Sequence, residues 1–155
     1  MSVCSSSNIG WQALGTFIYM SDGASPPNWT KVAKVDNIDG PGGTTDKVEV
    51  TTHDSVSDGF KKFLLDLSDG GTVTLTLVYD PTDPTHVGSN FSCLYQAFTD
   101  KQNRQWKVVW PTSPPYKNVF CAGVDGYKTM QAAKDALRAS VTLKVSGAFV
   151  PQSGS

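Results

Sequence analysis

Histidine and cysteine are scarce in this sequence, and their scarcity limits the chemistry that the chain can perform. Of 155 residues, two are histidine and three are cysteine. Cys4, Cys93 and Cys121 are odd in number and far apart, and they lack the paired spacing of a zinc site, a redox motif or a disulfide framework. We therefore expect no metal, no cofactor and a reducing compartment.

The sequence also lacks an excess of charge of either sign and any long apolar run. Thirteen Lys and Arg residues stand against fourteen Asp and Glu residues, which gives a formal net charge of −1 and disfavours a general nucleic-acid or acidic-membrane surface. No stretch approaches the roughly 18 apolar residues of a membrane span. The first residues lack the basic and apolar regions of a signal peptide. These absences predict a soluble chain that neither enters a membrane nor is exported by a signal peptide.

What the sequence does contain suits a single globular domain. Hydrophobic residues make up 39% of the chain and aromatic residues 10%, which is enough for one well-packed core. The patterned segments lie in residues 11–147, whereas residues 1–10 and 148–155 are polar and are predicted to be terminal arms. Residues 36–45, rich in glycine and aspartate, are predicted to form a flexible loop.

The most strongly patterned stretch runs from Asp46 to Pro81 and predicts a strand, a helix and a second strand. Val48 and Val50 alternate with polar residues, as in a strand. Apolar residues then recur at helical spacing, at Val56, Phe60, Phe63, Leu64 and Leu67. The glycines at 70 and 71 are typical of a helix end. A second strand is indicated by alternation with threonines, at Val73, Leu75, Leu77 and Tyr79.

The rest of the chain adds strands and one more helix. Strands are predicted over 11–20, 29–35, 104–110, 118–127 and 140–145, with a bend or bulge at Gly123 and Gly126. The apolar residues between 89 and 101 recur at helical spacing, and residues 130–139 are predicted to form a loop or a single turn. About six or seven strands flanked by one or two helices, in an order that does not alternate throughout, predict a mainly β (α+β) fold, an antiparallel barrel or sandwich.

No catalytic constellation is evident. His53, Asp54 and Ser55 are consecutive and cannot adopt the geometry of a triad, whose members come from separate elements. His86, between prolines, is predicted to face solvent. The glycine-rich segment after Asp39 lacks the lysine and hydroxyl residue that end a P-loop. Trp106 and Trp110, next to basic residues, could stack on bases, although core packing is the favoured interpretation. We therefore predict that the chain is not an enzyme.

The ordered segments resemble a known family, the major tail tube proteins of long, non-contractile bacteriophage tails of the lambda-like kind. The resemblance covers Phe17 to Gly147 and rests on the order and spacing of several pieces. These are FIYMSDG before a tryptophan, VEVTTHDS, DGGTVTLTLVYD, FSCLYQAFTD, RQWKVVWP, FCAGVDGY and ASVTLKVSG. No single piece is a specific signature.

This resemblance implies a structural virion protein that forms hexameric rings. The rings would stack into the tail tube, the channel through which DNA passes into the host cell, without being held there. The implied partners are further copies of the chain and other tail proteins, namely the tape measure, the tail terminator and the baseplate or tip. The implied location is the virion tail, after assembly in the host cytoplasm. The immunoglobulin-like domain that follows the tube domain in the lambda protein is not expected.

Two sets of residues are candidates for the assembly. The glycine-rich loop is predicted to join one ring to the next, through Asp39, Gly40, Pro41, Gly42, Gly43 and Thr44. The outward faces of two predicted strands are candidates for the channel lining, through Lys47, Glu49, Thr51, Thr72, Thr74 and Thr76. Two alternative functions stay open from the residues alone. They are the tube protein of a contractile injection or secretion apparatus and a cytosolic β-barrel that binds a small ligand.

Overall fold

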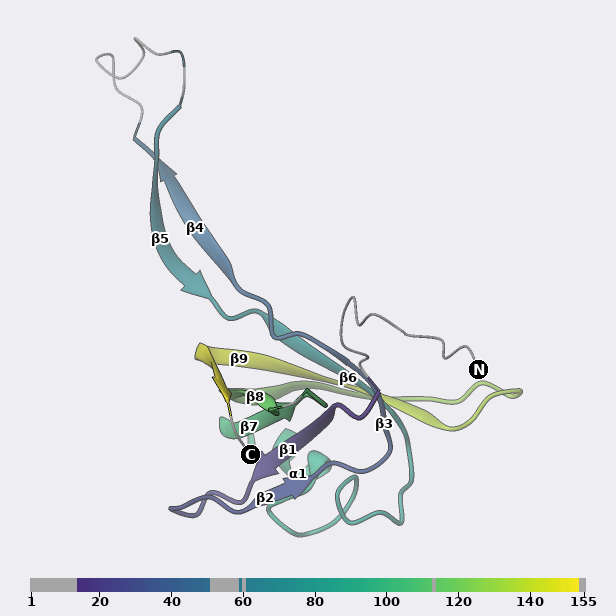
Figure 1. Cartoon of the computed structure of the whole chain (residues 1–155). Helices are drawn as coiled ribbons and strands as arrows, with labels where there is room; N and C mark the ends of the chain where they lie inside the picture. The colour runs from purple at the N-terminus through teal and green to yellow at the C-terminus, as the bar shows by residue number, and fades with distance from the viewer. Residues whose placement is uncertain (1–13, 51–58, 60, 113, 154–155) are drawn as a thin grey trace, which may run out of the picture.

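The computed structural model describes residues 14–50, 59, 61–112 and 114–153. Within these residues the chain is mainly β, as predicted, with nine strands and one short helix (Figure 1). The bounds are β1 Phe17–Ser21, β2 Trp29–Lys31, β3 Val35–Asp39, β4 Thr44–Glu49, β5 Phe63–Asp69, β6 Thr72–Val78, α1 Leu94–Asp100, β7 Arg104–Val109, β8 Tyr116–Met130 and β9 Arg138–Ser153.

Seven of these strands form one antiparallel sheet in the order β2-β1-β7-β8-β9-β6-β3. The sheet is rolled, so that β3 at one end of the order comes into contact with β1 near the other end. The amide of Val32 donates to the carbonyl of Ile18 close to this seam, at 3.0 Å. The register of β8 against β9 shifts between Val124 and Gly126, at the bend that the sequence predicts. The antiparallel barrel-like fold is confirmed.

The strands β6 and β7 alternate between core and surface along their length. On β6, Val73, Leu75 and Leu77 are buried, whereas the threonines between them point the other way. On β7, Trp106 is fully buried and its indole N–H donates to the carbonyl of Ala122 at 3.1 Å. This satisfied donor makes a large side chain tolerable at the centre of the core. Core packing, the favoured interpretation of Trp106, is therefore correct.

The helix predicted between Val56 and Leu67 is wrong over its described part. Residues 51–58 and 60 lie outside the described residues, but Phe63–Asp69 is strand β5, which pairs antiparallel with β4. The run Phe63-Leu64-Leu65 is apolar at consecutive positions, and periodicity alone does not separate such a run from a helix. The predicted β-α-β unit is instead one long hairpin. Its outer half, β4–β5, extends away from the rolled sheet as an arm (Figure 1).

The predicted ten-residue flexible loop is also wrong in its extent. Residues 36–39 belong to β3 and residues 44–45 to β4, which leaves residues 40–43 to connect them. These residues lie opposite Gly70 and Gly71, which connect β5 to β6. A Cβ on Gly71 would lie 2.1 Å from the carbonyl oxygen of Gly42, and Gly71 has a φ of +73°. The glycines thus allow two connections to cross in close contact, and we call them the glycine hinge: Gly40, Gly42, Gly43, Gly70 and Gly71.

The polar tail predicted from Gly147 onward is strand up to Ser153. After a register break, β9 resumes pairing with the first half of β8, where Val150 lies opposite Val119. The helix predicted over 89–101 is present but shorter, as α1, and Cys93 before it has extended backbone. Residues 131–137 form the expected turn between β8 and β9.

His86, predicted to face solvent, is fully buried. Its Nε2–H donates to the carbonyl of Ala33 at 2.7 Å, and its Nδ1 accepts from the amide of Asp80 at 3.2 Å. The Asp80 carboxylate forms a salt bridge with Lys34, and this contact holds the pKa of Asp80 below its ordinary value. The proline-rich segment therefore folds back on the sheet around a buried histidine whose two ring nitrogens both have backbone partners.

The alternation on β6 predicts opposite outcomes for two neighbouring substitutions. Leu75→Ala should lower the free energy of unfolding by about 2–5 kcal/mol, because it opens a cavity in the core. Thr74→Ala, one residue away on the outer face, should change it by no more than about 0.5 kcal/mol. Urea unfolding of the dilute protein measures both. Equal losses from the two variants would contradict the assigned faces.

The glycine hinge predicts a second contrast. Gly71→Ala should lower the free energy of unfolding by at least about 1–3 kcal/mol, because it combines a positive φ with a steric clash. Gly42→Ala is the matched control, since a Cβ there meets nothing within 4 Å. Amide hydrogen exchange should show faster exchange in β4 and β5 for the first variant alone. An unchanged exchange pattern in Gly71→Ala would mean that the crossing does not hold the arm.

Candidate assembly interface

The arm exposes large apolar side chains that its own fold does not cover. Leu65 and Leu67 of β5 are 76% and 81% exposed. Four further apolar residues of the arm are also exposed, namely Val48, Val50, Phe63 and Leu64. Isolated two-stranded hairpins are marginally stable in water, and contiguous exposed apolar surface usually marks an interaction site. The arm is therefore the first candidate for an interface.

Both faces of the arm carry apolar residues. Lys47 lies opposite Leu65 and Glu49 opposite Phe63, so these four share one face. Val48 lies opposite Leu64 on the other face, and alternation places two carboxylates, Asp46 and Asp66, on that same face. Within the described residues, neither carboxylate is in a salt bridge. An arm with two such faces can contact two surfaces at once.

The three threonines predicted to line a channel lie on one polar outer face. Thr74 pairs with Thr142 and Thr76 with Ser140, which adds hydroxyl groups from β9. Two charged pairs lie at the ends of this face: Arg138 with Asp36 at 2.7 Å and Lys144 with Asp69 at 3.0 Å. The amide of Gly71 and then Lys144 lower the pKa of Asp69. Lys128 of β8 lies opposite Ser140 and Asp39 of β3 opposite Thr74, at the two sides of the face. We call this hydroxyl-rich surface the polar face: Thr72, Thr74, Thr76, Ser140 and Thr142.

The other channel candidates do not lie on the polar face. Lys47 and Glu49 are exposed on the arm, and Thr51 lies outside the described residues. The predicted ring-joining segment, Asp39 to Thr44, forms the base of the arm rather than a free loop. The sequence prediction therefore assigned these residues to the wrong kind of element, and their roles in assembly stay predictions.

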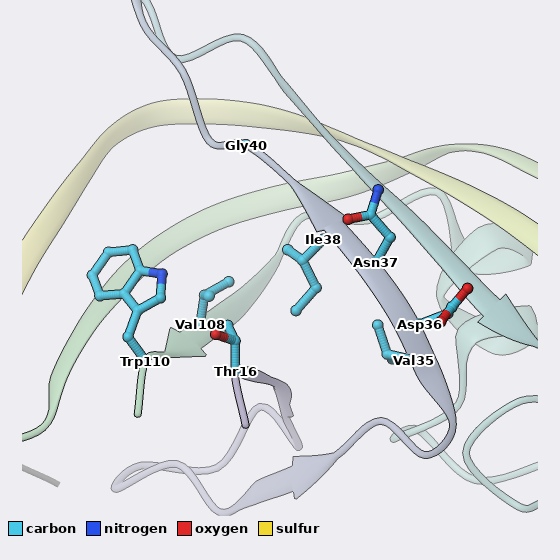
Figure 2. Close-up of a pocket in the computed structure, with 8 residues that line it drawn as sticks. All are labelled: Thr16, Val35, Asp36, Asn37, Ile38, Gly40, Val108 and Trp110. Carbon is cyan, nitrogen blue, oxygen red and sulfur yellow. The ribbon is translucent and has the colours of Figure 1, made fainter. Parts of the chain in front are cut away.

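The seam of the rolled sheet holds a cavity of about 160 Å³. Figure 2 shows Val35 and Ile38 of β3 pointing across it toward Val108 and Thr16, with Trp110 on the far side, whereas Asp36 points away. The hydroxyl of Thr16 is buried without a hydrogen-bond partner. The cavity lies where β3 presents an edge that no strand among the described residues pairs with, and such an edge can pair with another chain.

A second outer face is basic and aromatic. It is formed by β2, β1, β7 and the first half of β8, and two of its lysines contact aromatic rings on neighbouring strands. Lys31 lies over the ring of Phe17 at 3.7 Å, and Lys107 lies over Tyr19 at 4.9 Å and Trp29 at 4.7 Å. Burial, followed by the nearby charge of Lys117, lowers the pKa of Lys107. We call it the basic face: Phe17, Tyr19, Trp29, Lys31, Lys107, Val109, Lys117 and Val119.

The described part of the structure shows neither a cluster of three metal-ligating side chains nor a helix that could cross a membrane. His53, Asp54 and Ser55 lie outside this part. The core is filled, with Trp106, Met20 and Ile18 at zero exposure, so side chains occupy the space that a small-ligand barrel leaves for its ligand.

Solved structures with a similar fold come from phage-like tails and from contractile injection systems. The tail of an empty gene transfer agent particle, computed with C6 symmetry, matches with a TM-score of 0.62 at 11% identity, over 86% of this chain and 92% of that chain. The sheath-tube complex of the extracellular contractile injection system PVC matches with a TM-score of 0.68 at 11% identity, over 95% and 94%. The SPP1 tail tube matches with a TM-score of 0.67 at 9% identity, over 94% and 80%.

Among curated protein sequences, none matches this chain. The decisive match is to a sequence family described as the phage tail tube of the lambda-like kind, over residues 10–150. This range contains the rolled sheet, the arm and α1. The resemblance seen in the order of the sequence segments is therefore confirmed: the chain belongs to the lambda-like phage tail tube protein family.

Proposed function

We propose that six copies of this chain form a ring and that the rings stack into the tube of a non-contractile phage tail, through which DNA passes into the host. The observation that carries the proposal is the arm, whose leucines stay exposed in the single chain. A stack of rings provides each arm with neighbouring copies that cover it. Six equal contacts per ring junction add up, so a weak single contact becomes strong through multivalency.

Six-fold symmetry is supported by the fold that the chain shares with the gene transfer agent tail, which was computed with C6 symmetry. The contractile alternative has support from the likeness to a sheath-tube complex. The family match to the lambda-like tail tube favours the non-contractile tail. The uncovered edge of β3 supports lateral closure of the ring, since pairing with a neighbouring copy removes an exposed sheet edge.

We assign a revised role to the segment from Asp39 to Thr44. Instead of reaching the next ring itself, it sets the direction in which the arm leaves the sheet, together with Gly70 and Gly71. The close approach of Gly71 to Gly42 supports this role, because it leaves little freedom for the crossing. The arm then carries the ring-joining contacts.

We assign the channel lining to the polar face, through Thr72, Thr74 and Thr76. DNA must slide past this wall, and unpaired lysines would hold its phosphates. The hydroxyl ladder of β6 and β9 supports this assignment, because its own residues carry no charge and the Lys144 and Arg138 at its ends are paired with aspartates. Lys47, Glu49 and Thr51 are not part of this lining in our proposal.

The function proposed here is structural, with no catalysis and no cofactor. The partners are other copies of the chain and further tail proteins, such as the tape measure, the terminator and the baseplate or tip. DNA is in passing contact only. The protein would assemble in the host cytoplasm and end in the virion tail.

Loss of the arm leucines should separate folding from assembly. Leu65→Ser combined with Leu67→Ser should give a folded monomer that forms no tubes, because both side chains are largely exposed in the single chain. Leu137→Ser, in the turn before β9, is the control and should still assemble. Sedimentation and negative-stain microscopy measure the outcome. Normal tubes from the double variant would exclude the arm as the ring-joining element.

The polar face should be reachable only through the bore of an assembled tube. A cysteine introduced as Thr74→Cys should react with a small maleimide in both monomers and tubes. A maleimide attached to a large polymer should label it in monomers but not within tubes. Peptide mapping by mass spectrometry distinguishes this site from the exposed Cys121. Labelling of intact tubes by the large reagent would place the polar face on the outside.

A further inference from the structure

The basic face lacks acidic side chains. Its three lysines are Lys31, Lys107 and Lys117, and the strand positions between them hold aromatic residues, valines and Gln105. Among the described residues that point outward from this part of the sheet, none is aspartate or glutamate. On the other side of the sheet, two basic side chains have acidic partners, namely Arg138 with Asp36 and Lys144 with Asp69. This face therefore differs from the polar face in charge and in apolar content.

Lys107 shows why the face suits a covering partner. It lies between the rings of Tyr19 and Trp29, and it is partly withdrawn from water. A nearby anion would stabilise the charged form of Lys107 in that position. The positive charge of the neighbouring Lys117 makes an anionic partner more favourable still. Phe17 is 40% exposed at the edge of the same cluster, so an occupant that combines carboxylate and aliphatic groups fits best.

One face of the arm has this composition. It carries Val48 and Leu64, which are 51% and 61% exposed, next to Asp46 and Asp66. Neither aspartate is in a salt bridge among the described residues. The arm leaves the sheet at the glycine hinge and points away from it (Figure 1), so its own basic face is not available to it.

We propose that the arm face with Val48, Leu64 and Asp66 docks on the basic face of a second copy, with Asp66 near Lys107. The inference rests on the proposed tube function and adds to it the surface that receives the arm. The apolar residues cover Phe17 and Tyr19, and the carboxylates of the arm lie near Lys107 and Lys31. The opposite arm face, with Phe63 and Leu65, stays available for a further contact.

Nucleic acid fits the face less well. Phosphates would pair with the lysines but would leave the valines and Phe17 without an apolar cover. A strong hold on phosphate also conflicts with passage of DNA along a channel. Binding of nucleic acid to this face is thus a contrary outcome of the test below.

Charge reversal across the pair tests the docking. Asp66→Lys and Lys107→Glu should each abolish tube formation at physiological ionic strength, because each places like charges together. The chain that carries both changes should assemble again, and so should an equal mixture of the two single variants. Lys31→Glu is a second variant on the exposed edge of the face, in case Lys107→Glu disturbs folding. Lys134→Glu, in the turn between β8 and β9, is the control and should assemble normally.

The readouts are sedimentation, microscopy and circular dichroism, so that loss of fold is separated from loss of assembly. Tubes from both single variants, or no rescue by the double change, would overturn the docking. A Lys107→Glu variant that assembles but loses binding to a DNA duplex would assign the face to nucleic acid instead.

A photo-crosslinking residue in place of Leu64 distinguishes this inference from the tube function itself. In wild-type-like tubes it should crosslink to peptides of β1 or β7 from another copy. Tubes whose crosslinks fall on β3, β6 or β9 would overturn the docking and leave the tube function intact. Failure of the wild-type protein to assemble with or without other tail proteins would contradict the tube function.

Discussion

The arm cannot bury its own apolar side chains, and this constraint governs the rest of the structure. A two-stranded ribbon has no second layer on which to pack, so leucines on both of its sides stay in contact with water. Burial of such side chains contributes roughly 1.5–3 kcal/mol each, which becomes available only when another surface covers them. In the single chain the sheet has a buried core, whereas the apolar side chains of the arm remain exposed to water. Assembly with other copies would bury them.

The outer sides of the sheet offer surfaces on which the arm of another copy can pack. The seven strands bury one common core, and their outer sides divide into a polar face on β6 and β9 and a basic, aromatic face on β2, β1, β7 and β8. The first face is rich in hydroxyl groups, and the second combines lysines with aromatic rings. The glycine hinge fixes where the arm leaves this body, because Gly71 passes Gly42 too closely for any other residue type. The sheet, the glycine hinge and the two outer faces together are the features expected of a subunit that assembles with identical copies.

A strand that buries one face, such as β6, could be predicted from the sequence. A strand that is exposed on both faces, such as β5, could not. Val73, Leu75 and Leu77 alternate because only one side of β6 meets the core. The segment from Phe63 to Leu67 does not alternate between apolar and polar residues, because both sides of β5 are exposed. The spacing of its apolar residues therefore predicted a helix instead of a strand. The prediction that His86 faces solvent was wrong, because it rested on the polar, proline-rich sequence around the histidine. The sequence does not reveal that the backbone groups of Asp80 and Ala33 bond to its ring in the fold. The basic face depends on strand pairing that brings Lys31 beside Lys107, so no local pattern could indicate it.

The central claim is that neighbouring copies cover the arm. The most direct measurement is a helical reconstruction of tubes by cryo-electron microscopy, at a resolution that places side chains. The account predicts that β4 and β5 of each copy lie against other copies, with Leu65 and Leu67 buried between them. A map in which the arms extend into solvent, or fold back on their own subunit while the rings still stack, would contradict it.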